Sequence, residues 1–211
     1  MKIHPFVCGP LENNVYLVAD ELSGDAMIVD APFDTAATLG PVLREHKLTV
    51  RYIVNTHGHF DHIADNAALK RLTGAPILCH PDDEMLLKDP SRMKFFGLND
   101  SIEPTKADRH LNHGDTITLG QLTFRVAHCP GHARGHIVLH EPNEKVCFCG
   151  DVIFAGSVGR TDFPGSSWET LAASIRDHIL SLPDDTKLLP GHGPATTVGR
   201  EKRMNPFVAE I

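Results

Sequence analysis

The sequence predicts an α/β fold in which strands and helices alternate and stack in layers. Short apolar runs with strand character alternate with segments of helical periodicity along roughly the first 90 residues. Four of the predicted strands also lead into residues that can bind metal, and strand ends in layered α/β folds converge on one rim. A chain of 211 residues with 41% hydrophobic content can bury one substantial core, so we expect a single domain over residues 1–211.

The N-terminal segment is predicted as an antiparallel hairpin followed by a helix. The apolar runs 15–19 and 26–29 are separated by a turn-rich link, which is typical of a hairpin. Asp30 ends the second strand, where its carboxylate either orients a metal-bound histidine or satisfies a turn. The next helix is expected over 34–46, with an aspartate as N-cap and Pro41 as an unfavourable interior residue.

Strands and helices then continue to alternate. The expected elements are a strand at 52–54, a helix at 65–72 closed by Gly74, a strand at 76–78 and a helix beginning at 81–84. Residues 89–110 lose this periodicity but keep several apolar side chains. We expect this segment to pack on the core, and the alternative is a loop that covers a site.

The second half of the chain reads mainly as strands. Apolar and polar residues alternate over 122–127, so that strand is expected to be half buried. The predicted strands are 116–119, 122–127, 137–139, 146–149 and 187–189, with one helix from 166 to 179 that begins in a capping-box pattern. The five cysteines are not spaced as a disulfide framework, so we expect reduced thiols, with Cys147 and Cys149 packed in the core.

The segment between residues 56 and 62, with the sequence THGHFDH, carries four residues that can bind metal. Imidazole nitrogens and carboxylate oxygens suit a borderline-soft divalent ion. His57 and His59 are two apart, so in an extended segment both side chains leave on one side and can hold the same ion. Asp61 and His62 follow one turn later and are better placed for a second ion, so the spacing predicts two metals.

Three later strand ends supply the remaining candidate ligands. The first ion would be bound by His57, His59 and His132, and the second by Asp61, His62 and His192, with Asp151 bridging both. Three nitrogens leave an open position on the first ion, which is the arrangement of a catalytic site. Such ions generate hydroxide at neutral pH, so the predicted chemistry is hydrolysis, with Asp61 and Asp151 as the catalytic carboxylates. Zinc is the ion expected first, and iron and manganese accept the same ligands.

The ordered motifs of this chain resemble those of the metallo-β-lactamase superfamily. The matching segments are 56–62, 129–132, 150–151 and 190–193, with the sequences THGHFDH, CPGH, GD and PGHG. The resemblance covers nearly the whole chain, and it implies a four-layer αβ/βα metallo-β-lactamase sandwich with the metals at one edge. It does not by itself choose among thioesters, lactones, β-lactams, phosphodiesters and oxygenase chemistry.

Finer motifs resemble the short bacterial glyoxalase II-like (hydroxyacylglutathione hydrolase-like) hydrolases. These motifs are GRTDFP at 159–164, HCPGH at 128–132, GH at 135–136 and NPF at 205–207. The resemblance implies a thioesterase of methylglyoxal detoxification that cleaves S-D-lactoylglutathione to D-lactate and glutathione with a metal-bridging hydroxide. It also places Arg160 near the glutathione part of the substrate. From the residues alone, Arg160 is either a carboxylate clamp or part of a structural salt bridge.

Two departures from the longer glyoxalase II enzymes bear on the substrate. Their C-terminal helical extension, which holds glutathione, has no counterpart before Ile211, and Gly193-Pro194 stand where they carry an acid and a tyrosine. Glutathione recognition is therefore expected to be thinner here than in those enzymes. The main alternative is a persulfide dioxygenase, which shares the GRTDF segment and would bind one iron through His57, His132 and Asp151.

Composition excludes several other classes. A formal charge of −7 without a basic run argues against a nucleic-acid partner, including for a tRNA-processing nuclease. No stretch is long and apolar enough for a membrane span, and the N-terminus lacks the apolar run of a secretory signal, so a cytoplasmic location is expected. The partner is expected to be a small molecule, and no signal for an oligomeric state is present.

The other histidines have weaker signals. His128 could support His132 by contacting its ring from behind. We expect the remaining histidines without a complete ligand motif to be surface or core residues, namely His80, His110, His113, His136, His140 and His178.

Overall fold

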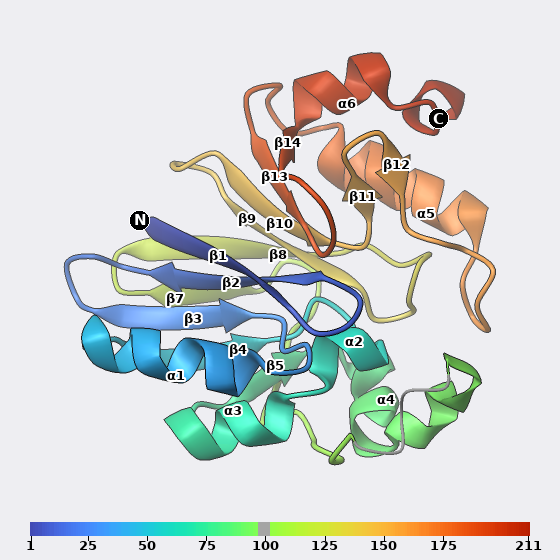
Figure 1. The fold of residues 1–211 in the computed structure, drawn as a ribbon. Helices are drawn as coiled ribbons and strands as arrows, with labels where there is room; N and C mark the ends of the chain where they lie inside the picture. The colour runs from blue at the N-terminus through green and yellow to red at the C-terminus, as the bar shows by residue number, and fades with distance from the viewer. Residues whose placement is uncertain (97–101) are drawn as a thin grey trace.

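The computed structural model describes residues 1–96 and 102–211, which form four layers (Figure 1). Two six-stranded sheets face each other, and helices cover the outer face of each sheet. A separate two-stranded ribbon pairs β11 (Ile153–Phe154) with β12 (Ser157–Val158). The arrangement confirms the expected αβ/βα sandwich.

The N-terminal sheet is mixed, with antiparallel pairs at one side and parallel pairs at the other. Its strands, in spatial order, are β1 (Lys2–Cys8), β2 (Asn13–Ala19), β3 (Asp25–Val29), β4 (Thr49–Val54), β5 (Ile77–Cys79) and β6 (Arg109–His110). The associated helices are α1 (Thr35–Glu45), α2 (Phe60–Ile63), α3 (Asn66–Thr73), η1 (Pro81–Asp83), α4 (Glu84–Lys88) and η2 (Pro90–Phe96).

The second sheet is antiparallel except where β10 runs parallel to β13. Its strands, in spatial order, are β14 (Thr196–Thr197), β13 (Lys187–Pro190), β10 (Val146–Gly150), β9 (Ile137–Glu141), β8 (Leu122–His128) and β7 (Thr116–Leu119). The elements of the outer layer are α5 (Trp168–Ser174), the π-helical turn η4 (Ile175–Ile179), α6 (Val198–Met204) and η5 (Val208–Glu210).

Three apolar clusters join the four layers. In β2, Val15 and Leu17 pack toward the first helical layer, whereas Tyr16 and Val18 face the second sheet. This follows from the alternation of side chains along a strand, and it explains why β2 is buried on both faces. Cys147 and Cys149 lie in the third cluster, so their expected packing role is confirmed, and all five cysteines are free and buried.

Most of the expected elements are present, with two informative differences. Strand β1 has no counterpart in the sequence analysis, because it is an edge strand with a half-exposed pattern and a proline at position 5. Asp34 precedes α1 as expected but makes no side-chain cap. Instead, Asp65 Oδ2 accepts a hydrogen bond from the backbone N–H of Ala36, 2.6 Å away, so the cap comes from a distant residue.

The segment from residue 89 to 110 packs on the core where it is described. Met93 and Ile102 are buried in the cluster under the first sheet, which agrees with the expected packing. The central part of the segment, residues 97–101, lies outside the described residues. The alternative of a loop that covers a site falls in part on those residues.

Candidate metal centre

Seven predicted ligands from both sheets meet at one edge of the sandwich. His57 and His59 follow β4, and Asp61 and His62 lie on the short helix α2. The others come from the second sheet, with His132 after β8, Asp151 after β10 and His192 after β13. The strand ends of the two facing sheets therefore deliver the site jointly, as the sequence predicted.

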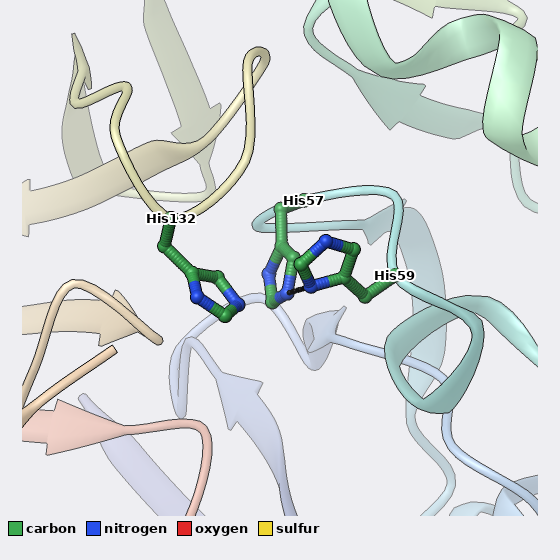
Figure 2. Close-up of side chains that lie close together, drawn as sticks. All are labelled: His57, His59 and His132. Atoms are coloured by element: carbon green, nitrogen blue, oxygen red, sulfur yellow. Dashed lines mark hydrogen bonds between the residues drawn. The ribbon is translucent and has the colours of Figure 1, made fainter. Parts of the chain in front are cut away.

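The first group consists of His57, His59 and His132, whose rings point toward one another (Figure 2). The Nε2 atom of His57 is 3.1 Å from the Nδ1 atom of His59, and the rings of His59 and His132 have centroids 4.5 Å apart. The Nε2 atom of His132 is buried and has no hydrogen-bond partner within the described chain. A buried nitrogen without a partner is costly, so this group is suited to a cation.

The second group consists of Asp61, His62 and His192. The Oδ2 atom of Asp61 is 3.6 Å from His62 Nε2 and 3.3 Å from His192 Nε2. Asp151 lies between the two groups, with Oδ1 3.5 Å from His62 Nε2 and Oδ2 3.6 Å from His132 Nε2. The clusters are thus suited to a dinuclear metal site with Asp151 at its centre.

Hydrogen bonds fix the tautomers of four of these histidines. In each, Nδ1 contacts an oxygen, and Nε2 is left for the site. The pairs are His57 with Thr56 Oγ1 (3.1 Å), His62 with Asp30 Oδ2 (2.9 Å), His132 with the Arg160 carbonyl (2.8 Å) and His192 with the Leu11 carbonyl (3.1 Å). Carbonyl and carboxylate oxygens only accept, and the Thr56 hydroxyl already donates to Asp30 Oδ2 at 2.9 Å. Nδ1 therefore carries a proton in all four histidines, and Nε2 is the atom left to bind a metal. Asp30 thus contacts a predicted ligand, as its orienting role requires, and it also accepts hydrogen bonds from the N–H of Thr56 at 2.7 Å and from the Thr56 hydroxyl at 2.9 Å.

The charges of the site also fit divalent cations. Burial disfavours ionised Asp151, but the surrounding histidines, His62 first among them, outweigh burial and hold the pKa of Asp151 well below its usual range. Burial likewise opposes ionisation of Asp61, yet the charge of His62 helps to lower its pKa to about 2. The neighbouring carboxylates raise the pKa of His62 despite its burial. Without a metal ion, His62 therefore carries a second proton, at Nε2, which balances the carboxylates of Asp151, Asp61 and Asp30, and a metal ion can take the place of that proton.

Burial keeps two histidines of the first group neutral. It lowers the pKa of His59 to about 3 and the pKa of His57 well below its usual value. Neutral imidazole is the form that binds metal, so these two side chains need no deprotonation before they bind an ion.

His136 has a role that the sequence analysis did not assign. It is fully buried, its ring stacks on His57 with centroids 4.7 Å apart, and its Nε2 accepts a hydrogen bond from the backbone N–H of Asp151 at 3.0 Å. His136 therefore supports one ligand from each sheet. The Gly135-His136 pair was visible in the sequence, but the contact with Asp151 spans 15 residues and depends on the folded loops.

Asp83 is a second residue whose role the sequence did not reveal. Its buried carboxylate accepts a hydrogen bond from the N–H of Gly58 at 2.8 Å and another from the N–H of Gly135 at 2.7 Å. It thereby ties the loop that carries His57 and His59 to the loop that carries His132. A Cβ atom at Gly58 would lie 3.0 Å from Asp83, and one at Gly135 would lie 2.7 Å from its backbone nitrogen, so both positions favour glycine.

We expect Asp83→Asn to weaken binding of the first ion by about 10- to 100-fold, as for other residues that position metal ligands. An amide NH₂ would replace one acceptor oxygen and face a backbone N–H, so one of the two loops loses its tether. Chelator competition measures the affinity, with Asp82→Asn as the matched control, because Asp82 is the exposed neighbour on the same turn. Equal affinities in the two variants would contradict the assigned role.

Arg160 is placed beside the site but pairs locally. Its exposed guanidinium makes two bonds to Asp162, Nε to Oδ1 at 2.9 Å and Nη2 to Oδ2 at 2.8 Å. It also lies over the ring of Phe163, 4.5 Å from the centroid. Of the two roles expected for Arg160, the salt bridge is the one that this structure contains.

His128 does not have the partners expected of it. Its Nε2 pairs with the Arg134 carbonyl at 2.8 Å, and its ring stacks on the ring of His80. Among the described residues, the ring of His128 therefore contacts Arg134 and His80 and not the ring of His132. His80, Asp82 and His128 do bring ligand atoms within 4.8 Å of one another. The two rings are parallel within 8°, however, which directs their nitrogens side by side and not at a common point.

A cavity of about 330 Å³ opens onto the predicted metal ligands. It lies over His59, Asp61, His132, Asp151 and His192, and its other lining residues are Leu11, Phe60, Phe154, Arg160 and Phe163. The volume is in the range of small-molecule sites, and the wall is mainly apolar apart from the ligands and Arg160. Among the described helices, none is both long and apolar enough to cross a membrane.

Comparison with known proteins agrees with this geometry. The chain is 39% identical to the hydroxyacylglutathione hydrolase GloC of Haemophilus influenzae, with 99% of this chain and 98% of GloC covered. It is 28% identical to the human mitochondrial persulfide dioxygenase ETHE1, over 90% of this chain and 69% of that protein.

Two solved structures are similar along nearly their whole length. The B3 metallo-β-lactamase BLEG-1 superposes with a TM-score of 0.92 at 35% identity, covering 98% of this chain and 99% of BLEG-1. The di-iron-bound form of TTHA1623 superposes with a TM-score of 0.86 at 37% identity, covering 97% of this chain and 99% of TTHA1623. The family model of the metallo-β-lactamase superfamily matches residues 8–192, and the chain therefore belongs to the metallo-β-lactamase superfamily.

Proposed function

We propose that this protein is a dinuclear metal-dependent hydrolase that cleaves the thioester S-D-lactoylglutathione to D-lactate and glutathione. The observation that carries the proposal is the position of Asp151 between two complete ligand groups. Similarity to a hydroxyacylglutathione hydrolase over the full chain supports the substrate class. The predicted ligands agree with a metal-dependent hydrolase, and a probable metallo-hydrolase is also among the relatives.

In this proposal one ion would be held by His57, His59 and His132, and the other by Asp61, His62 and His192. Asp151 would be within reach of both. When bound, two divalent ions supply a deprotonated water near neutral pH and polarise the carbonyl oxygen of the substrate. Zinc is the ion proposed first, and iron remains an alternative in view of the di-iron relative.

The side chains of this protein would orient the substrate and shield it. Asp61 belongs to the second group and also lines the cavity. Its carboxylate can therefore accept a hydrogen bond from the attacking water. Phe154 and Phe163 form apolar walls that limit water around the thioester. A thiolate is a good leaving group, so no separate general acid is required.

Persulfide dioxygenase activity is the second candidate, because a persulfide dioxygenase is among the relatives. One iron would then be held by His57, His132 and Asp151. The placement of His192 favours the hydrolase, since its Nε2 faces Asp61 and Asp151 at 3.3 and 3.7 Å and its Nδ1 is held by a carbonyl. A single-ion enzyme would not need this arrangement.

The deciding experiment measures metal content by elemental analysis on the same sample that is assayed for three activities. These are hydrolysis of S-D-lactoylglutathione, oxygen uptake with glutathione persulfide, and hydrolysis of a β-lactam. We expect close to two ions per chain and thioester cleavage, with His192→Ala losing one ion and most of the hydrolysis. A single iron with oxygen uptake that survives His192→Ala would establish the dioxygenase instead, and β-lactam cleavage alone would exclude the thioesterase.

We propose that Arg160 leaves Asp162 when substrate binds and pairs instead with a carboxylate of the glutathione moiety. We expect Arg160→Gln to raise KM for the thioester by about two- to fivefold with little change in kcat, as for other exposed ion pairs. Arg176→Gln is the matched control, because Arg176 is also exposed and makes the same two-bond pair with the adjacent Asp177. A fall in kcat alone would assign Arg160 a different role.

A further inference from the structure

The side chain of Asn13 lies inside the second ligand group, although the sequence analysis gave it no role. Its Nδ2 atom is 2.9 Å from Asp61 Oδ2, 3.3 Å from His62 Nε2 and 3.2 Å from His192 Nε2. Asn13 is only 1% exposed, so its carboxamide is buried among these side chains. One end of the carboxamide therefore touches all three residues proposed to hold the second ion.

These separations are those of neighbouring ligands around one ion. With metal–ligand bonds of about 2.0–2.2 Å, adjacent ligand atoms lie about 2.8–3.1 Å apart in octahedral coordination and about 3.3–3.6 Å apart in tetrahedral coordination. The neighbouring pair formed by His57 Nε2 and His59 Nδ1 has the same spacing, 3.1 Å. The terminal atom of Asn13 thus lies at the distance from Asp61, His62 and His192 that a further ligand of a shared ion would have.

The other end of the carboxamide has no partner. Asn13 Oδ1 is buried without a hydrogen-bond partner within the described residues, whereas Nδ2 donates to Asp61 Oδ2 and lies beside the Nε2 atoms of His62 and His192. A half-turn about the Cβ–Cγ bond exchanges the two ends and places Oδ1 in the position of Nδ2. Amide nitrogen has no lone pair for a metal, whereas amide oxygen is an accepted ligand of divalent ions.

The backbone around Asn13 holds this position. Asn13 forms a single antiparallel bridge with His192, and the N–H of Asn14 donates to the Gly191 carbonyl at 2.7 Å. The side chain of Asn14 donates to the carbonyls of Pro190 and Gly193 at 2.9 and 2.8 Å. The start of β2 is therefore fastened to the loop that carries His192, which fixes Asn13 beside that ligand.

We propose that Asn13 is a ligand of the second metal ion through Oδ1, an inference that rests on the dinuclear site proposed above. The second ion then has Asp61, His62, His192, Asp151 and Asn13 as protein ligands, one more than the first ion. A neutral amide oxygen adds coordination without charge and favours harder ions of higher coordination number, such as Mn²⁺ or Fe²⁺, in this position. The two sites would therefore differ in metal preference.

The alternative account is that Asn13 keeps Nδ2 inward and only orients Asp61 as a hydrogen-bond donor. The variants Asn13→Ala and Asn13→Asp separate the two roles. Alanine removes both functions, whereas aspartate retains an oxygen ligand but loses the donor and faces Asp61 with a like charge. The control is Asn14→Ala, which loosens the same loop without removing an atom from the ligand group.

The test is stepwise binding of Zn²⁺ and Mn²⁺ to the metal-free protein in competition with a chromophoric chelator, together with a crystal structure of the loaded protein. We expect Asn13→Ala to weaken the second binding step about 10- to 100-fold without changing the first, and more for Mn²⁺ than for Zn²⁺. Asn13→Asp should bind the second ion within about tenfold of the unmodified protein. The loaded crystal structure should place an Asn13 side-chain atom about 2.0–2.3 Å from the ion.

Three outcomes would overturn the inference. These are an Asn13 side chain farther than about 3 Å from the ion, a second step as tight in Asn13→Ala as in the unmodified protein, or an Asn13→Asp variant as weak as Asn13→Ala. A loss in Asn14→Ala equal to that in Asn13→Ala would likewise assign the effect to loop placement and overturn it. Binding of only one ion by the unmodified protein would instead refute the dinuclear proposal itself.

Discussion

Replacement of Asp151 by alanine is expected to lower kcat/KM for thioester hydrolysis by at least about 10³-fold and to reduce the metal content below two ions per chain. The two oxygens of Asp151 face His62 at 3.5 Å, His132 at 3.6 Å and His192 at 3.7 Å, so the carboxylate serves both ligand groups. Without it, the remaining charge of the site no longer matches two divalent ions.

The measurement combines elemental analysis with steady-state kinetics at a fixed concentration of added metal. Asp177→Ala is the control, because Asp177 is an exposed acid paired with the adjacent Arg176 and lies outside the site. The control should retain two ions and the full rate. Retention of both ions and of normal hydrolysis by Asp151→Ala would contradict the bridging role.

Gly191→Ala is expected to lower kcat/KM by at least about 10²-fold and to weaken binding of the second ion, although no ligand is removed. A Cβ atom at Gly191 would lie 2.2 Å from Asp151 Oδ1 and 2.7 Å from His62 Cε1. Both neighbours are buried and held by other contacts, so they cannot move aside at low cost. The methyl group would therefore displace the carboxylate between the two groups.

Gly193→Ala provides a matched control two residues away in the same loop. A Cβ atom there meets nothing within 4 Å, but the φ angle of +71° disfavours alanine. This variant should lose about 1 kcal/mol of unfolding free energy while keeping both ions and the rate. Urea denaturation and metal analysis of the two variants separate a steric effect on the ligands from backbone strain. Equal loss of metal in both would show that the loop, and not the Asp151 contact, is sensitive.

Local sequence predicted most of the fold because most strands carry their own signal. Apolar runs located β2, β3, β5 and β7 to β10 to within about two residues, as expected where burial on one or both faces dictates the residues. Strand β1 was not predicted, because an edge strand that is half exposed does not need a run of apolar residues. It is defined by its pairing with β2. The cap of α1 by Asp65 was equally hidden, because donor and acceptor are 29 residues apart.

The sequence predicted the ligand chemistry of the site. Histidines and acids at glycine-marked strand ends gave seven predicted ligands, and the fold brings them together as two groups of three with Asp151 between them. This was possible because metal binding demands particular residue types, and those types are visible one at a time.

The residues that hold those ligands in place could be identified only from the folded structure. Asn13, Asp83 and His136 are of types that occur in any turn or core, and their roles arise from partners 15 to 179 residues away. The structure likewise paired Arg160 with Asp162 and directed His128 to the Arg134 carbonyl. The last two contacts are local but depend on the loop conformation. The contacts of Asn13 with His192 and of Asp83 with Gly135 depend on the relative placement of the two sheets, which no local pattern encodes.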